Sequence, residues 1–297
     1  MTNLLEDASM AKMRTLMVSG INMRVHSRHA PEEYVELWRA LAKMKKPKPR
    51  GVTALMIGSQ RRLKPEDPDS PFFGYLYRFV NIDPDDPWFD IETQKRAVAE
   101  DVAKVSIPKK LKPNLTEIPY LFDVARHHLY FVSGGTGASV SPGAVDSLIE
   151  YLGEFDRIKD RFGRIDRTIL TREGTLEALL KWPEIREIKV LLERPNPTEF
   201  DDDDAFYKRL QRRSVHKEEH SFFKAPEAET ITPDAEMKSM FSRAVSDGLY
   251  KQRGLNTKGK LEEASSSDYP RKEVGEYDPD IQLESDAFVE LVTRKFG

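Results

Sequence analysis

The chain has 297 residues, of which 39% are hydrophobic and 9% aromatic, enough for a packed core and too much for an intrinsically disordered protein. Its 47 lysines and arginines nearly balance its 50 aspartates and glutamates, so the net charge of −3 by itself predicts neither a nucleic-acid nor a membrane partner. The sequence has no cysteine, which excludes disulfides, cysteine-ligated zinc, iron–sulfur clusters and a thiol nucleophile.

The N-terminal segment and the hydropathy pattern predict a cytoplasmic protein without a membrane partner. Residues 1–12 lack the basic start and long apolar run of a signal peptide, and we expect them to form a loose leader. No stretch approaches the roughly 18 to 20 apolar residues that span a bilayer.

The first third of the chain predicts the order strand, helix, strand, strand, helix. Pro31 stands in the first turn of the first helix, where proline is favoured. The expected elements are strands at 16–25, 52–57 and 72–82, and helices at 31–44 and 91–105. The apolar positions of the second helix are Ile91, Val98, Val102 and Val105. This order opens a ferredoxin-like βαββαβ unit, which we expect over residues 13–135.

Residues 136–297 predict a second α/β half that includes a C-terminal hairpin. Pro142 after Ser141 marks a helix start. A β-α-β unit is expected over 165–193, where Arg194-Pro195-Asn196-Pro197 stops its last strand. Further expected elements are helices at 202–213 and 233–246, a hairpin at 248–266 and a terminal helix after residue 285. The fold class is α+β, with a ferredoxin-like βαββα unit and a mixed, mostly antiparallel sheet; the two halves can also form one compact domain.

Several blocks of this sequence resemble one uncharacterised family, a domain of unknown function found in bacterial, archaeal and viral genomes. The blocks are 120–131, 141–145, 188–197, 246–254 and 265–270. Arg194-Pro195-Asn196-Pro197 and the spacing from Gly248 to Ser265-Ser-Ser-Asp-Tyr-Pro270 are the most specific parts. The resemblance spans about residues 13–270 and associates the chain with mobile elements and phage defence. It implies no catalytic residues. The sequence predicts no cofactor.

A basic run between residues 43 and 64 is the first candidate site. It holds eight positive side chains and no acidic one: Lys43, Lys45, Lys46, Lys48, Arg50, Arg61, Arg62 and Lys64. These residues flank the expected second strand, so both ends of the run would face one phosphate backbone. Positive side chains at such density bind phosphates without regard to sequence. The alternative is a solvated loop.

Aromatic side chains alternate along the third strand. Phe73, Tyr75, Tyr77 and Phe79 fall on one face, which would stack nucleic-acid bases if it were exposed. The alternative is that these rings belong to the core. Arg126, in Arg126-His127-His128, would contact a phosphate, or the segment is simply a hairpin turn.

The segment His216-Lys-Glu-Glu219-His220 matches the inverted zincin spacing. On a helix this spacing sets two histidines one turn apart as metal ligands, with Glu219 beside them. No third ligand is identifiable, and the alternative is a charged, exposed segment without metal.

The leading hypothesis is a nucleic-acid-binding protein that uses Lys45, Lys46, Lys48, Arg50, Arg61, Arg62, Lys64, Tyr75, Tyr77 and Arg126. One alternative is a metal-dependent hydrolase or nuclease that uses His216, Glu219 and His220, so the chain's status as an enzyme stays open. Another is a subunit of a multi-protein complex or a homo-oligomer, with the 248–266 hairpin as a pairing edge.

Overall fold

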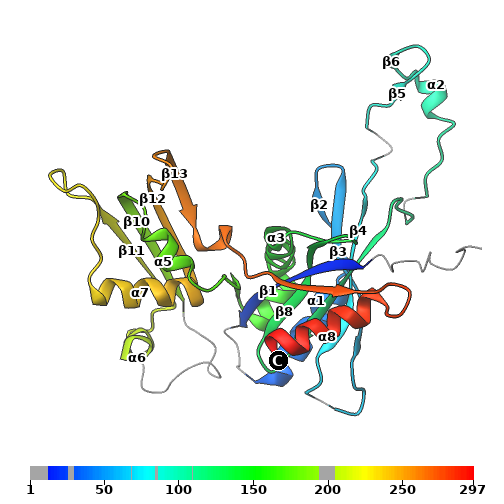
Figure 1. Cartoon of the computed structure of the whole chain (residues 1–297). Helices are drawn as coiled ribbons and strands as arrows, with labels where there is room; N and C mark the ends of the chain where they lie inside the picture. Colours follow the sequence, from blue (N-terminus) through cyan, green and yellow to red (C-terminus); the bar gives the residue numbers. More distant parts are fainter. Residues whose placement is uncertain (1–12, 26–29, 68, 84–85, 109, 194–204) are drawn as a thin grey trace, which may run out of the picture.

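The computed structural model describes residues 13–25, 30–67, 69–83, 86–108, 110–193 and 205–297. The expected leader at 1–12 and the Arg194-Pro195-Asn196-Pro197 block lie outside these ranges. Two antiparallel sheets dominate the structure, each with its own hydrophobic core (Figure 1). The α+β class with mostly antiparallel sheets is thereby confirmed.

The larger sheet has eight strands in the order β14-β1-β8-β7-β4-β3-β2, with β9 also paired to β1. Its strands are β1 (Arg14–Val25), β2 (Lys48–Arg50), β3 (Thr53–Arg62), β4 (Phe72–Val80), β7 (Thr116–Asp123), β8 (His128–Gly135), β9 (Ile165–Ile169) and β14 (Glu273–Tyr277). β1 pairs with three strands: its first half pairs with β14 and its second half with β9, while β8 runs along its other side.

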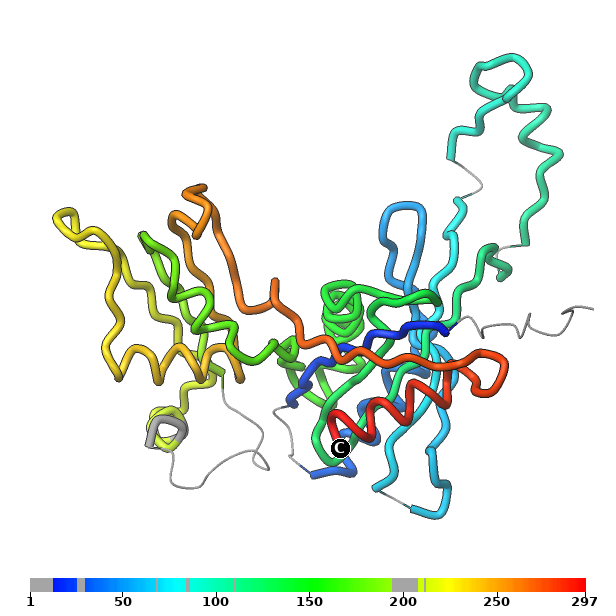
Figure 2. Tube along the Cα trace, viewed as in Figure 1, coloured from blue at the N-terminus to red at the C-terminus, as the bar shows by residue number. Residues whose placement is uncertain are grey.

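Helices cover both faces of the larger sheet: α1 (Pro31–Lys43), α3 (Pro142–Gly153), α4 (Asp156–Phe162) and α8 (Glu284–Phe296) (Figures 1 and 2). Leu121 and Phe122 are neighbours on β7 and therefore point to opposite faces. Phe122 stacks on Trp38 of α1 at 4.7 Å between ring centroids, whereas Leu121 lines a cleft together with Val292 of α8. We call these two faces of the sheet the α1 face and the α8 face.

The smaller sheet has the order β11-β10-β12-β13. Its strands are β10 (Glu184–Glu193), β11 (Lys217–Phe223), β12 (Gly248–Leu255) and β13 (Leu261–Ser265), and α5 (Thr175–Leu179), α6 (Ala205–Arg212) and α7 (Ala235–Ser246) belong to the same part of the chain. Ile188 and Val190 of β10 are buried in one cluster with Phe241 of α7 and Tyr250 of β12. A short 3-10 turn, Ser266–Asp268, follows the β12–β13 hairpin.

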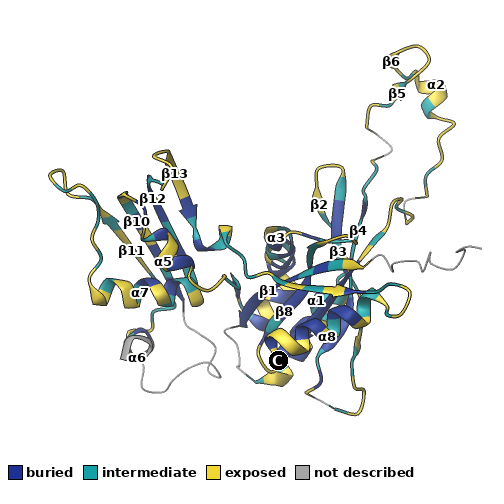
Figure 3. Cartoon of the chain, in the orientation of Figure 1, coloured by how far each residue is buried: buried dark blue, intermediate teal, exposed yellow. Residues whose placement is uncertain are grey.

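The ferredoxin-like detail is not confirmed. In place of the helix expected at 91–105, an arm carries the two-residue strands β5 (Phe89–Asp90) and β6 (Lys95–Arg96) and the four-residue helix α2 (Ala99–Val102). Ile91 is 80% exposed and Val98 56%, so the apolar positions meet no core, as the exposed tip of the arm in Figure 3 shows. Four isolated apolar residues among charged ones cannot hold a helix against a sheet.

The chain after residue 136 contributes to both sheets. α3, β9, β14 and α8 pack in or on the larger sheet, so β9 and β10, expected as one β-α-β unit, lie in different sheets. How the chain divides into folding domains stays a prediction. Among the described helices, none has the length and apolar content to cross a membrane.

Candidate nucleic-acid interface

The basic run divides into two groups at opposite ends of β3. Lys48 and Arg50 lie on β2, which pairs with the start of β3, and exposed Lys45 and Lys46 precede them. Arg61 and Arg62 are the last residues of β3, followed by exposed Lys64. Eight residue steps of a strand span roughly 26 Å. The two groups are therefore separate surfaces.

One of these groups joins the aromatic residues of β4. Residues paired across antiparallel strands lie on the same face. The register pairs Arg61 with Phe73, and Phe73 with Leu121, which places Arg61 and the alternating residues Tyr75 and Tyr77 on the α8 face. The Arg61 guanidinium lies 5.2 Å from the centre of the Phe73 ring, within cation–π range.

Arg62 points the opposite way. Its guanidinium lies 4.7 Å from the Phe72 ring on the α1 face, and its Nη1 donates to the Ser70 carbonyl at 3.0 Å. Neighbouring strand residues alternate in direction, so one surface cannot use both arginines of the pair.

The rings of β4 divide between core and surface. Phe73 and Phe79 are buried, at 4% and 9% exposure, whereas Tyr75 and Tyr77 are half-buried. The Tyr75 ring meets Phe73 edge-on at 5.3 Å, and the Tyr77 hydroxyl lies 3.3 Å from Ser59 Oγ. Tyr75 and Tyr77 thus keep part of their surface accessible beside Arg61.

Lys64 and Arg126 line one cleft of about 360 Å³ on the α8 face. Arg126 lies in the turn between β7 and β8, where Asp123 Oδ1 accepts the backbone N–H groups of Ala125 and Arg126. Asp123 Oδ2 accepts a bond from Arg126 Nη1 at 3.0 Å, which fixes the half-exposed guanidinium at the cleft. We call this hollow the α8 cleft.

A second cleft, of about 630 Å³, continues from Arg126 towards the smaller sheet. Arg271 and Lys295 line it together with Tyr130, which both clefts share with Arg126. Glu273 and the Lys295 carbonyl hold the Arg271 guanidinium at 2.8 and 3.0 Å. Three cationic side chains therefore line this junction cleft.

The His216 segment forms a strand where the inverted zincin spacing requires a helix. His216 precedes β11 and lies 2.8 Å from Asp166 Oδ2, while His220 lies on β11, 2.9 Å from Glu218 Oε1. Glu219 alternates away from His220 along the strand. Among the described residues, no group of three histidines, aspartates or glutamates is placed to hold a metal.

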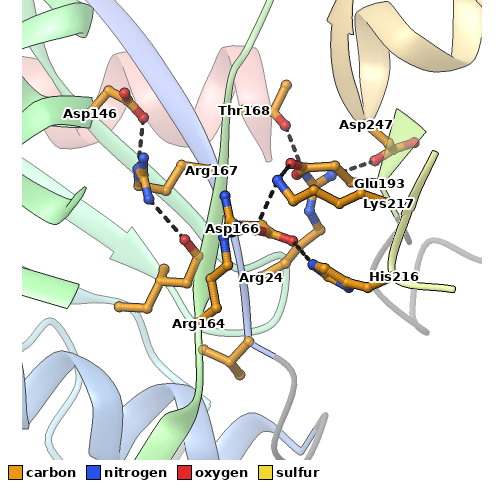
Figure 4. Close-up of polar contacts among 12 residues, drawn as sticks. Arg24, Asp146, Arg164, Asp166, Arg167, Thr168, Glu193, His216, Lys217 and Asp247 are labelled. Atoms are coloured by element: carbon orange, nitrogen blue, oxygen red, sulfur yellow. Dashed lines mark hydrogen bonds and ion pairs between the residues drawn. The ribbon is translucent and has the colours of Figure 1, made fainter. Parts of the chain in front are cut away.

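A buried ion network joins the two sheets (Figure 4). Arg24 of β1 has a fully buried side chain, and its guanidinium donates to Glu193 Oε2 at 2.8 Å, Asp247 Oδ1 at 3.0 Å and Thr168 Oγ1 at 2.6 Å. Thr168 lies on β9 of the larger sheet, whereas Glu193 ends β10 and Asp247 follows α7. One guanidinium therefore bridges both sheets.

Asp166 of β9 extends the same network. Its side chain is 1% exposed and contacts His216, Lys217 at 3.4 Å and Arg164 at 3.2 Å, and Lys217 also pairs with Glu193. Every carboxylate here has a cationic partner, as buried charges require. His216 and Lys217 therefore contribute to the contact between the two sheets.

Asp146 of α3 is a carboxyl group whose pKa is raised above its ordinary value. Burial raises the pKa of Asp146, and the Arg167 guanidinium, whose Nε lies 3.0 Å from Asp146 Oδ1, offsets part of that rise. The charge of Lys48 also lowers the pKa of this carboxyl, and Arg50 of β2 lines one cavity with Ala144 at the start of α3.

The fold and these surfaces define a protein of two antiparallel sheets joined by a buried ion network. The family model described as Domain of unknown function (DUF4747) matches residues 14–293. The chain therefore belongs to that family. No curated protein matches the chain.

Proposed function

We propose that this chain is a cytoplasmic protein that binds single-stranded nucleic acid on the α8 face of its larger sheet. The observation that supports it is the shared placement of Arg61, Tyr75 and Tyr77 on one open face next to the cleft of Lys64 and Arg126. Half-exposed rings stack unpaired bases, and arginine and lysine side chains hold the backbone.

The spacing of the rings fits an extended strand. Tyr75 and Tyr77 are two residues apart on β4, so their Cα atoms are roughly 6.6 Å apart, a distance suited to successive unstacked bases. From these rings the backbone would pass Arg61, enter the α8 cleft at Lys64 and reach the junction cleft at Arg126. Arg62 on the opposite face would not take part.

The first test measures binding of a fluorescent 12-nucleotide single strand by anisotropy over a salt series. Reversing two charges in Arg61→Glu/Lys64→Glu should weaken binding and flatten the slope of log affinity against log salt by about 1.4, because each lost phosphate contact on a single strand contributes about 0.7. The matched control is Lys45→Glu/Lys46→Glu, which makes the same charge change at the other end of β3. Equal effects of the two pairs, or salt-independent binding by the wild type, would contradict the proposal.

The second test concerns stacking. Tyr75→Ala/Tyr77→Ala should lower affinity at least tenfold, because stacking a base on an aromatic side chain contributes about 1–3 kcal/mol. Tyr75→Phe/Tyr77→Phe keeps both rings and should bind as the wild type does. A loss of affinity in the phenylalanine pair equal to that in the alanine pair would argue against stacking. Roles in phage defence or in a multi-protein complex stay predictions.

A further inference from the structure

The most distinctive remaining feature is a cavity of about 560 Å³ on the α1 face, at the end of β3 away from the α8 cleft. It is lined by residues of β2, β3, β4 and β8 and by the segment that leads into α3. Two arginines and several hydroxyl groups line it, and Ala54, Leu55, Val140 and Ala144 supply the apolar remainder. The polar lining residues are Arg50, Thr53, Arg78, Ser133, Ser139 and Ser141.

The two arginines carry uncompensated charge. The described lining contains no aspartate or glutamate, and neither Arg50 nor Arg78 pairs with a carboxylate in the described part of the chain. Arg78 is half-buried, and its Nη1 donates to the Ser139 carbonyl at 3.0 Å, so its guanidinium has a fixed orientation. A half-buried cation without a counter-charge favours an anion next to it.

We propose that this cavity binds the phosphate group of a phosphorylated small molecule. Guanidinium groups match the oxygens of a phosphate monoester in geometry and charge, and serine and threonine hydroxyls can donate to the same oxygens. The volume lies within the range of small-molecule sites, and the apolar lining suits the organic part of the ligand. This site lies on the opposite face from the nucleic-acid surface and does not depend on that proposal.

Isothermal titration calorimetry on the full chain tests the site with inorganic phosphate, a nucleoside 5′-monophosphate and the matching unphosphorylated nucleoside. The wild type should bind the monophosphate saturably with a Kd of about 1 mM or tighter and should not bind the nucleoside. Arg50→Gln should weaken binding at least about tenfold, because it removes a charge-assisted contact to the phosphate. Lys46→Gln removes an exposed positive charge outside the cavity and should leave binding unchanged.

Arg78→Gln should also weaken binding, but Arg78 is half-buried and this variant can lose stability. Arg50 is exposed, so Arg50→Gln keeps the test valid on a folded protein. No saturable binding of phosphate or monophosphate by the wild type would overturn the proposal, as would equal affinities of Arg50→Gln and Lys46→Gln. A 5′-phosphorylated oligonucleotide that binds more tightly than the monophosphate, in an Arg50-dependent way, would overturn the small-molecule assignment.

Discussion

At the scale of single residues, Arg24 has the most demanding environment. Its side chain is 0% exposed, and it neutralises Glu193 at the end of β10 and Asp247, which follows α7. A buried pair gains little relative to apolar packing, but removing one partner leaves a carboxylate in a medium that solvates it poorly. The stability of the contact between the two sheets therefore depends on Arg24 and its two carboxylate partners all being present.

Arg24→Met should lower the free energy of unfolding by about 3–5 kcal/mol, because Glu193 and Asp247 lose their shared cation. The measurement is urea unfolding followed by circular dichroism at pH 7. Arg164→Met is the matched control: that side chain is 65% exposed, and Asp166 keeps its contacts with His216 and Lys217, so the loss should be about 1 kcal/mol or less. Equal losses in both variants would show that burial does not decide the effect.

Asp146 predicts a specific pH dependence. Burial raises its pKa above 3.8 in the folded state, so the folded protein holds this proton at a pH where the unfolded chain has lost it. The contribution of Asp146 to stability is therefore full below pH 3.8 and falls as the pH rises through the folded pKa. Asp146→Asn should flatten stability against pH in that window, measured as urea midpoints. An unchanged profile would contradict the prediction.

At the scale of elements, the arm at 86–108 contrasts with the strands that lead into it. β4 contributes Phe72, Phe73 and Leu76 to the core, and Leu76 is 0% exposed. The arm keeps Phe89, Ile91 and Val98 largely exposed. Burial of Leu76 therefore stabilises the fold, whereas Ile91, fifteen residues further along the chain, is solvated and contributes little to stability.

Ile91→Ser should change the free energy of unfolding by less than about 0.5 kcal/mol, since the side chain is already solvated. Leu76→Ala should cost about 2–5 kcal/mol, because it leaves a cavity in the core. Chemical denaturation of both variants makes the comparison. A large loss from Ile91→Ser would mean that the arm packs against something in solution.

The sequence anticipates elements whose signals are local. Pro31 and Pro142 place α1 and α3 at their observed starts, and the block from Arg194 to Pro197 places the end of β10. It does not anticipate the ion network, because Arg24 and Glu193 are 169 residues apart and neither stands in a motif. The sequence does not predict a role for Arg78 for the same reason. A single arginine in an apolar strand becomes a candidate binding residue only once the fold brings β2 and α3 next to it. The histidine spacing misleads because it implies a metal site only on a helix.

At the scale of the whole molecule, the C-terminal segment completes the larger sheet. β14 pairs with β1, and α8 buries Phe288, Leu291, Val292 and Phe296 on the sheet. Burying one such side chain contributes about 1.5–3 kcal/mol, so four of them contribute on the order of the net stability of a whole domain.

Deleting residues 284–297 should therefore abolish cooperative folding of the larger sheet. The expected result is binding of a hydrophobic dye and loss of the thermal transition that the full chain shows. Ile281→Ser, next to the deletion and 84% exposed, should keep that transition. A truncated protein that melts as sharply as the full chain would contradict this expectation.

The pairing of β1 with three strands, one of them near the C-terminus, has a consequence for synthesis on the ribosome. Of the strands in the larger sheet, β1 leaves the ribosome first, yet Arg14 finds its partner only when Tyr277 is made. Until then the nascent chain carries this long, largely buried strand with an open edge, and such edges recruit other chains. Pairing so distant in sequence also folds slowly. Translation speed and chaperone supply, more than the stability of the finished protein, should therefore set how much of it reaches the native state in the cell.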